Sequence, residues 1–164
     1  RAMMAEIGVR VHSHTMAIGE VEAVTGEDSQ VIDWDVVEAS PVRVADAEAE
    51  PRMIAAIDAA KESLDSLGGI FEVRATGLPI GLGAHVQWDR RLDGRIAQAI
   101  LAINAVKGVE VGPGFSNARK PGSEVHDQLL PISEWGDRPW AAGYGCSYAG
   151  HSAVWPHVRV LLHR

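Results

Sequence analysis

Cysteine is almost absent from this 164-residue chain, in which Cys146 is the single one. A lone cysteine excludes the intramolecular disulfide framework that staples small secreted domains. We therefore expect a reducing compartment, the cytoplasm. The chain also lacks an apolar run of the roughly 20 residues that cross a bilayer, and we recognise no signal peptide. The sequence thus predicts no membrane partner.

Positive charge is scarce as well. Lysine and arginine number 15 against 22 aspartate and glutamate residues, for a formal net charge of -7. Nucleic acids and anionic membranes select a basic surface, so we expect no nucleic-acid partner. The chain contains neither a G-x-x-x-x-G-K-[ST] phosphate loop nor a G-x-S-x-G nucleophile elbow. These absences argue against a P-loop nucleotidase and an α/β-hydrolase.

The histidines offer weak metal-ligand spacing. His12 and His14 lie two residues apart in a strand-like segment, so their side chains share one face. A zinc site needs a third and a fourth ligand, for which His85 and His126 are candidates only by residue type. We interpret both histidines as structural or surface residues and predict no metal site. A metal-dependent hydrolase that uses them is the least favoured hypothesis.

What the chain does contain is a regular alternation of periodic segments, with 46% apolar residues. Period-2 and β-rich runs predict strands, at Val9–Ile18, Ile70–Thr76, Val109–Val111 and the "VRVLL" near the end. Period-3.6 runs predict helices, at Arg1–Ile7, Asp33–Ala39, Asp46–Leu67 and Leu92–Lys107. Such an order favours one domain, or a piece of one, with mixed α and β layers.

Three local predictions follow from these patterns. Alternation in the first strand places His12, His14, Met16 and Ile18 on one face. The helix over Asp46–Leu67 turns one apolar stripe to a core and stops at a Gly-Gly pair; the stripe consists of Met53, Ile57, Ala60, Leu64 and Leu67. In the helix over Leu92–Lys107, Lys107 complements the dipole of the last turn and Gly108 caps the end.

The segment Thr76–Phe115, "TGLPIGLGAHVQWDRRLDGRIAQAILAINAVKGVEVGPGF", resembles the central signature of chorismate synthase. That signature consists of a G-[LV]-P-x-G-L-G loop, a D-x-R-L-D helix start and an I-[NQ]-A-[VFI]-K-G-V-E-[IV]-G turn that ends in G-F. Three further stretches resemble the family in order: "MMAEIGVRVHSHTMAIG", "AKESLDSLGGIFEVRATGLP" and "RKPGSEVHD". The resemblance covers residues 1–130, which we interpret as the central part of a chorismate synthase domain.

The resemblance implies an α+β fold, the β-α-α-β layered sandwich of this family, here in part and assembled as a homotetramer. It implies a lyase of the shikimate pathway of aromatic amino acid biosynthesis. The family converts 5-enolpyruvylshikimate 3-phosphate to chorismate and phosphate, a 1,4-elimination that requires reduced FMN. These properties come from the resemblance and not from composition or spacing.

The resemblance also assigns two site residues. In the family the Asn/Gln-Ala pair of the I-[NQ]-A-x-K-G turn contacts FMN, and here that pair is Asn104 and Ala105. A small residue permits close approach of a flavin, and an amide offers both a donor and an acceptor. Without the resemblance, Asn104 would be interpreted as a polar residue at a helix end. Lys107 would then either add positive charge near an anionic cofactor or only complement the helix dipole.

Several family motifs are missing. The G-E-S-H-G and R-P-G-H-A-D motifs, which supply the histidines proposed as general acids, are absent, so no catalytic residue is assigned. The chain begins with helix-like residues after the expected R-x-S-x-R-E-T segment, which suggests a fragment. Residues 131–164 form a divergent tail whose glycine rhythm fits a one-base shift in the coding DNA near Pro131–Arg138. The alternative function is therefore a catalytically inactive fragment that acts only as a folding and association module.

Overall fold

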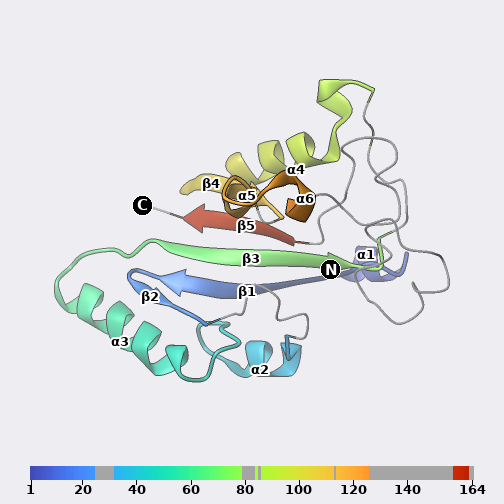
Figure 1. Ribbon diagram of the computed structural model, residues 1–164. Helices are drawn as coiled ribbons and strands as arrows, with labels where there is room; N and C mark the ends of the chain where they lie inside the picture. Colours follow the sequence, from blue (N-terminus) through green and yellow to red (C-terminus); the bar gives the residue numbers. More distant parts are fainter. Residues whose placement is uncertain (25–31, 79–83, 85, 113, 126–156, 163–164) are drawn as a thin grey trace.

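The computed structural model of the chain describes residues 1–24, 32–78, 84, 86–112, 114–125 and 157–162. An antiparallel five-stranded sheet lies at its centre, in the order β2-β1-β3-β5-β4 (Figure 1). The strands are β1 (Arg10–Ile18), β2 (Val21–Glu22), β3 (Gly69–Thr76), β4 (Val106–Val111) and β5 (His157–Leu162). The helices are α1 (Ala2–Ala5), α2 (Trp34–Ala39), α3 (Ala49–Glu62), η1 (Trp88–Arg90), α4 (Leu92–Leu101), α5 (Gly114–Asn117) and α6 (Gly122–Val125). The predicted α+β class is confirmed.

β5 is the last strand in the chain, yet it lies inside the sheet between β3 and β4. It pairs with β3 from Gly69↔Leu162 to Arg74↔His157, and with β4 from Val106↔Leu162 to Val111↔Val158. Its Val160 is fully buried. The strand predicted from "VRVLL" is therefore confirmed. The position of the predicted frame shift lies outside the described residues.

The register gives the sheet two unlike faces, because residues directly opposite each other in antiparallel strands share a face. The polar face carries His12, His14, Ala17, Glu72, Arg74 and Glu110. The apolar face carries Val11, Thr15, Ile18, Phe71, Val73, Val109 and Val160. A bulge between Thr15 and Ala17 shifts the alternation. The prediction that Ile18 shares a face with His12 and His14 is therefore wrong, and Met16 is the extra residue of the bulge.

Two hydrophobic clusters attach the helices to the sheet. Val44, Ala49 and Met53 form one cluster, against which Ile18 packs. Val106 and Val160 form the other, and residues of α4 and the apolar face pack on it: Phe71, Ile96, Ile100, Val109 and Leu162. In Figure 1, α2 and α3 lie beyond the β1–β2 side of the sheet, whereas α4 lies on the β4 side.

α3 is shorter than predicted at its carboxyl end. It ends at Glu62, and Leu64 takes a left-handed conformation (φ 56°) with 95% of its surface exposed. The Asp65 N–H donates to the Ala60 carbonyl at 2.9 Å, and the Ser63 hydroxyl donates to the carbonyl of Ala59 at 3.0 Å. These bonds satisfy the last carbonyls of the helix before the Gly-Gly pair is reached. Extension of the helix and its apolar stripe to Leu67 is therefore wrong.

α4 also ends earlier than predicted, at Leu101, because the chain joins the sheet at Val106. Lys107 and Gly108 both lie in β4, so their predicted roles in a helix terminus are wrong. Ala105 takes the left-handed position instead, at φ 70°. The pairing of Val106 with Leu162 accounts for the difference, since strand pairing competes with the last helical turn.

Candidate functional site

The two residues predicted to contact a flavin lie in the short connection between α4 and β4. Asn104 is exposed and Ala105 is half-buried. The Val106 N–H donates to the Ile103 carbonyl at 3.3 Å, and the Ile103 N–H donates to the Ile100 carbonyl at 3.0 Å. A left-handed conformation is uncommon for alanine and costs about 1 kcal/mol or more, so tertiary context maintains it here. The turn presents an amide and a small residue to the outside.

This turn shares one end of the sheet with two other segments. Leu162 of β5 pairs with Val106, which follows Ala105, and with Gly69, which follows the link from α3 to β3. Figure 1 shows this link, the start of β4 and the end of β5 on the same side of the molecule. We call this the turn end of the sheet: the α4–β4 turn (residues 102–105), the α3–β3 link (residues 63–68) and the end of β5.

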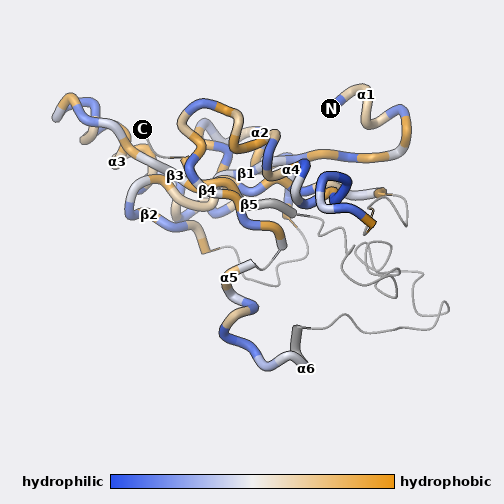
Figure 2. The backbone as a smooth tube through the Cα atoms, turned by 90° about the horizontal axis from the view of Figure 1, so that it is seen from above, coloured by the Kyte–Doolittle hydropathy of each residue, from blue (hydrophilic) through white to orange (hydrophobic). Residues whose placement is uncertain are grey.

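Large apolar side chains are exposed at the turn end. They are Leu64, Leu67, Ile103 and Leu161, and the exposed Leu101 at the end of α4 directly precedes the turn. Figure 2 shows hydrophobic stretches in the projecting link between α3 and β3. Clustered exposed apolar groups mark surfaces that a ligand or another protein segment covers.

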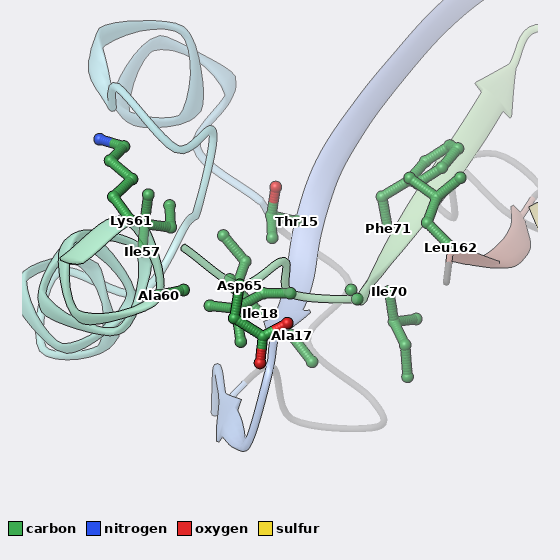
Figure 3. A pocket seen from close by; sticks show the side chains of 13 residues that line it. Thr15, Ala17, Ile18, Ile57, Ala60, Lys61, Asp65, Ile70, Phe71 and Leu162 are labelled. Atoms are coloured by element: carbon green, nitrogen blue, oxygen red, sulfur yellow. The ribbon is translucent and has the colours of Figure 1, made fainter. Parts of the chain in front are cut away.

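A groove of about 400 Å³ opens beside this end, between α3 and the sheet. In Figure 3, Ile57 and Ala60 of α3 lie on one side, Phe71 and Leu162 on the other, and Thr15 between them. Leu67 and Gly68 of the link also line the groove. Its lining is mainly apolar, with Lys61 and Asp65 as its charged residues.

The polar face of the sheet buries a charged cluster. His14 and Glu72 stand opposite each other in the register, each 1% exposed, and His14 Nε2 lies 2.9 Å from Glu72 Oε2. The Arg74 Nε–H donates to the same carboxylate oxygen at 2.5 Å. Because that oxygen accepts from a guanidinium and from an imidazole, the geometry fits an ionised Glu72 with the His14 proton on Nε2.

Trp34 of α2 packs against this cluster. Its ring stacks on His12 at a centroid distance of 4.5 Å, and it meets the His14 ring edge-on at 6.0 Å. The Nδ1 atoms of both histidines are buried without a hydrogen-bond partner. His14 is thus buried, and His12 is half-buried with its Nδ1 shielded from solvent. In the described part of the chain, no group of three or more His, Cys, Asp or Glu side chains could bind a metal ion. His85 and His126 lie outside that part.

The "GPGF" half of the family signature lies at the opposite end of β4 from Asn104. Six strand residues span about 20 Å, so the two halves do not meet. At the far end, the Phe115 N–H donates to Glu110 Oε1 at 2.6 Å, and Phe115 itself is 82% exposed. Gly114 has a φ of 35°, which favours glycine, and a Cβ there would lie 2.0 Å from Glu110 Cγ, so that a larger residue would displace the Glu110 side chain. The signature therefore forms two separate turns, one before β4 with Asn104 and one after β4 with Phe115.

Two carboxylates with lowered pKa values, Glu38 and Asp46, lie away from the turn end. Hydrogen bonds from Arg43 and then Arg1 lower the pKa of Glu38 to about 2. The N–H groups of Val24, Glu48 and Ala49 hold the pKa of Asp46 below its ordinary value. Glu38 therefore links α2 to Arg1 and Arg43, and Asp46 links the start of α3 to Val24. Neither carboxylate lines the groove.

Comparison with known proteins decides the family. A model of the family described as "Chorismate synthase" matches residues 1–145. The chain belongs to the chorismate synthase family. A chorismate synthase of Brevibacillus brevis is 52% identical over 136 residues, which cover 83% of this chain and 35% of that protein. A chorismate synthase of Chlorobaculum tepidum is 47% identical over 171 residues, which cover 99% of this chain and 43% of that protein.

The fold agrees with this assignment. A crystal structure of chorismate synthase superposes with a TM-score of 0.79 at 34% identity, covering 97% of this chain and 50% of that one. The chain spans less than half the length of the two curated chorismate synthases. Within the described residues, no helix has the length and apolar character needed to cross a membrane.

The groove is the feature that sequence reasoning missed. Its α3 wall was visible as the stripe that includes Ile57 and Ala60, but a stripe of this kind predicts only a buried core. The early end of α3 and the insertion of β5 leave that stripe open beside Phe71 and Leu162. No local signal in the sequence predicts either event.

Proposed function

We propose that this chain supplies one wall of the flavin site of an enzyme that converts 5-enolpyruvylshikimate 3-phosphate to chorismate and phosphate. Asn104 and Ala105 are the residues that contact FMN. The observation that carries this proposal is the α4–β4 turn, which presents an exposed amide beside a small left-handed residue in a chain of this family. The reaction belongs to the shikimate pathway of aromatic amino acid biosynthesis, in the cytoplasm.

The residues of the turn suit such a ligand. The Asn104 amide both donates and accepts hydrogen bonds, which complements the alternating carbonyl and N–H groups on the polar edge of a flavin ring. Ala105 has no side chain beyond Cβ, so a flat ring can approach the backbone closely. When bound, reduced FMN supplies electron density transiently as phosphate leaves the substrate. The turn binds and orients the ring, and it moves no proton.

No residue of this chain is assigned to proton transfer, because the family motifs with the general acids are absent from it. General acid–base catalysis contributes about 10²- to 10⁴-fold to typical enzyme rates. We therefore propose that the chain alone does not turn over and acts as a folding and association module. Residues 1–130 act as the central part of the domain, residues 131–164 are a divergent tail, and the complete enzyme assembles as a homotetramer.

An anaerobic assay with reduced FMN and 5-enolpyruvylshikimate 3-phosphate tests whether this chain alone can catalyse the reaction. The full-length Brevibacillus brevis chorismate synthase serves as the positive control. We expect chorismate from the control and none from this chain. Chorismate formed by this chain alone would show that it contains a complete set of catalytic groups and would overturn the fragment proposal.

A flavin titration tests the site residues directly. Asn104→Ala removes one amide and should weaken FMN binding about three- to tenfold, the usual worth of one hydrogen bond. Asn117→Ala is the matched control, because Asn117 lies in α5 at the other end of β4. Equal affinity of wild-type and Asn104→Ala chains would remove Asn104 from the site.

A further inference from the structure

We infer that the place of β5 in the sheet is a strand-binding site that also accepts β5 of a second copy of this chain. We call this place the β5 slot; residues 69–74 of β3 and residues 106–111 of β4 form its two edges. Two chains then associate by exchange of their last strands. The inference goes beyond the proposed function, because it concerns how chains associate and does not depend on the flavin contact.

β5 joins two parts of the sheet. In the described sheet, β3 and β4 each pair with β5 and not with one another (Figure 1). Withdrawal of β5 would open two strand edges and uncover Val106, which packs on the fully buried Val160. Open edges present unpaired N–H and C=O groups, which readily pair with a strand of another chain. The β5 slot therefore requires a strand, whichever chain supplies it.

The register gives the β5 slot a preference for a particular strand. Glu72 of β3 and Glu110 of β4 both stand opposite Arg159, and apolar residues of both strands stand opposite Val160. Opposite charges at directly opposed positions stabilise an antiparallel pair, whereas like charges destabilise it. The partner that fits the slot is thus an extended segment in which a basic residue precedes an apolar one. The β5 strand of a second copy has this pattern.

The chain is long enough for exchange. Residues 126–156 connect α6 to β5. Their contour length is about 100 Å, several times the roughly 30 Å diameter of a small domain. Exchange replaces each pairing within a chain by the same pairing between chains, so the two forms differ mainly in the entropies of association and loop closure. High protein concentration therefore favours the exchanged dimer.

A pair of cysteines across β4 and β5 can detect the exchange. Gly108 stands opposite Leu161, and a Cβ on Gly108 would lie 3.4 Å from Leu161 Cβ. This separation is close to the roughly 3.5–4.5 Å between the Cβ atoms of a disulfide. Cys146→Ser removes the natural thiol from every chain used. A chain with both Gly108→Cys and Leu161→Cys should form the bridge, which verifies the register.

The test divides the two cysteines between two otherwise intact chains, one with Gly108→Cys and the other with Leu161→Cys. The chains are mixed in urea, refolded together and oxidised, so that each β5 meets both slots. We expect covalent dimers on a non-reducing gel, at a yield at least about tenfold above that of a mixture with Leu64→Cys in place of Leu161→Cys. Because Leu64 is 95% exposed, this control measures random collision. Circular dichroism verifies that the refolded chains are folded.

A charge reversal tests the preference of the slot. Arg159→Glu, added to the chain with Leu161→Cys, places like charges opposite Glu72 and Glu110. The covalent yield should therefore fall about fivefold. Arg164→Glu is the matched control, because it makes the same change of charge beyond the end of β5. It should leave the yield within about twofold.

The contrary outcomes are distinct from a failure of the proposed function. If the mixture yields no more covalent dimer than the Leu64→Cys control, β5 stays in its own chain and the inference fails. A dimer in gel filtration would then show association through another surface. If the chain with both cysteines forms no bridge, the register is wrong and the inference also fails. An unchanged yield with Arg159→Glu would overturn the stated partner chemistry. None of these results bears on FMN binding by Asn104 and Ala105.

Discussion

The polar face of the sheet and its turn end differ in which side chains they bury. The polar face buries ionisable groups, whereas the turn end exposes apolar ones. On the polar face, His14 and Glu72 are charged or chargeable groups with almost no exposed surface. At the turn end, Leu64, Ile103 and other apolar side chains are largely exposed. Buried charge requires partners of fixed geometry, whereas exposed apolar surface is open to any partner that covers it.

The polar face and the turn end are therefore expected to differ in role. The polar face stabilises the fold, and the turn end is the surface available for binding. The cluster of His14, Glu72 and Arg74 joins neighbouring strands through one carboxylate oxygen, so it specifies their register. Around the turn end, two non-glycine residues, Leu64 and Ala105, adopt left-handed conformations. Such conformations persist where tertiary context maintains them, and they occur often at binding sites. Stability should therefore respond mainly to changes on the polar face, and ligand binding mainly to changes at the turn end.

The largest expected effect is from Glu72→Ala. The change leaves the His14 and Arg74 donors without this buried acceptor, and removal of one partner from a buried ion pair costs about 3–5 kcal/mol. Urea unfolding measures the loss, which should be smaller for Glu72→Gln because an amide oxygen still accepts one bond. Glu62→Ala on exposed α3 is the control. A loss below about 1 kcal/mol for Glu72→Ala would mean that the cluster adds little to the fold.

Met53→Ala is expected to cost nearly as much, about 3 kcal/mol, because Met53 is fully buried and its loss leaves a cavity under α3. Met3→Ala, at 80% exposure, should leave the free energy of unfolding unchanged within about 0.5 kcal/mol. The pair sharpens the comparison, since Met53 belongs to the helix that forms the groove wall. A small effect of Met53→Ala would show that the cluster around it collapses to fill the cavity.

Asp46→Asn should cost about 1 kcal/mol at pH 7, because Asp46 accepts from the N–H groups of Val24, Glu48 and Ala49 and so fixes the start of α3. These bonds lower the pKa of Asp46 below its ordinary value of 3.8. The ionised form is therefore favoured in the folded state. Its contribution is present above the ordinary pKa and is lost as the pH falls through the lowered value.

Urea unfolding between neutral and acidic pH measures this dependence. The difference in free energy between wild type and Asp46→Asn should shrink as the pH falls. Asp58→Asn, whose partner is the exposed Lys61, should change stability by no more than about 0.5 kcal/mol at any pH. A constant difference across the pH range would show that Asp46 acts through shape and not through charge.

The smallest effect, and one of opposite sign, is expected from Leu64→Gly. Glycine adopts φ 56° without the Cβ clash, so the variant should unfold at an equal or slightly higher urea midpoint, by up to about 1 kcal/mol. Loss of the exposed leucine removes little buried area. A destabilisation above about 1 kcal/mol would mean that Leu64 stabilises the fold. It would contradict the proposed difference between the turn end and the polar face.

Much of the secondary structure was predictable from local signals. The helix predicted over Asp33–Ala39 is confirmed as α2, and the Asp33 carboxylate caps it by accepting from the N–H groups of Asp35 and Val36. The strand predicted over Ile70–Thr76 is confirmed as β3, in which Phe71 and Val73 share one face. The ends of α3 and α4 were not predictable, since strand pairing and left-handed turns fixed them.

The candidate site was predictable only in part. The family signature singled out Asn104 and Ala105, and the structure places them together in one exposed turn. The same signature ends at Phe115, which lies at the other end of β4. The groove depends on Leu162, far along the chain from Ile57 and Ala60, so no pattern of short range contains it.

The sequence by itself determined the chemical alternation of each strand, the apolar stripes of the helices and the family to which the chain belongs. These follow from neighbouring residues, whose spacing fixes which side chains share a face. Only the tertiary structure decided that β5 lies between β3 and β4, that Glu72 contacts both His14 and Arg74, and that a groove opens between α3 and the sheet. The physical reason is that long-range strand pairing sets distances between segments that local spacing leaves free.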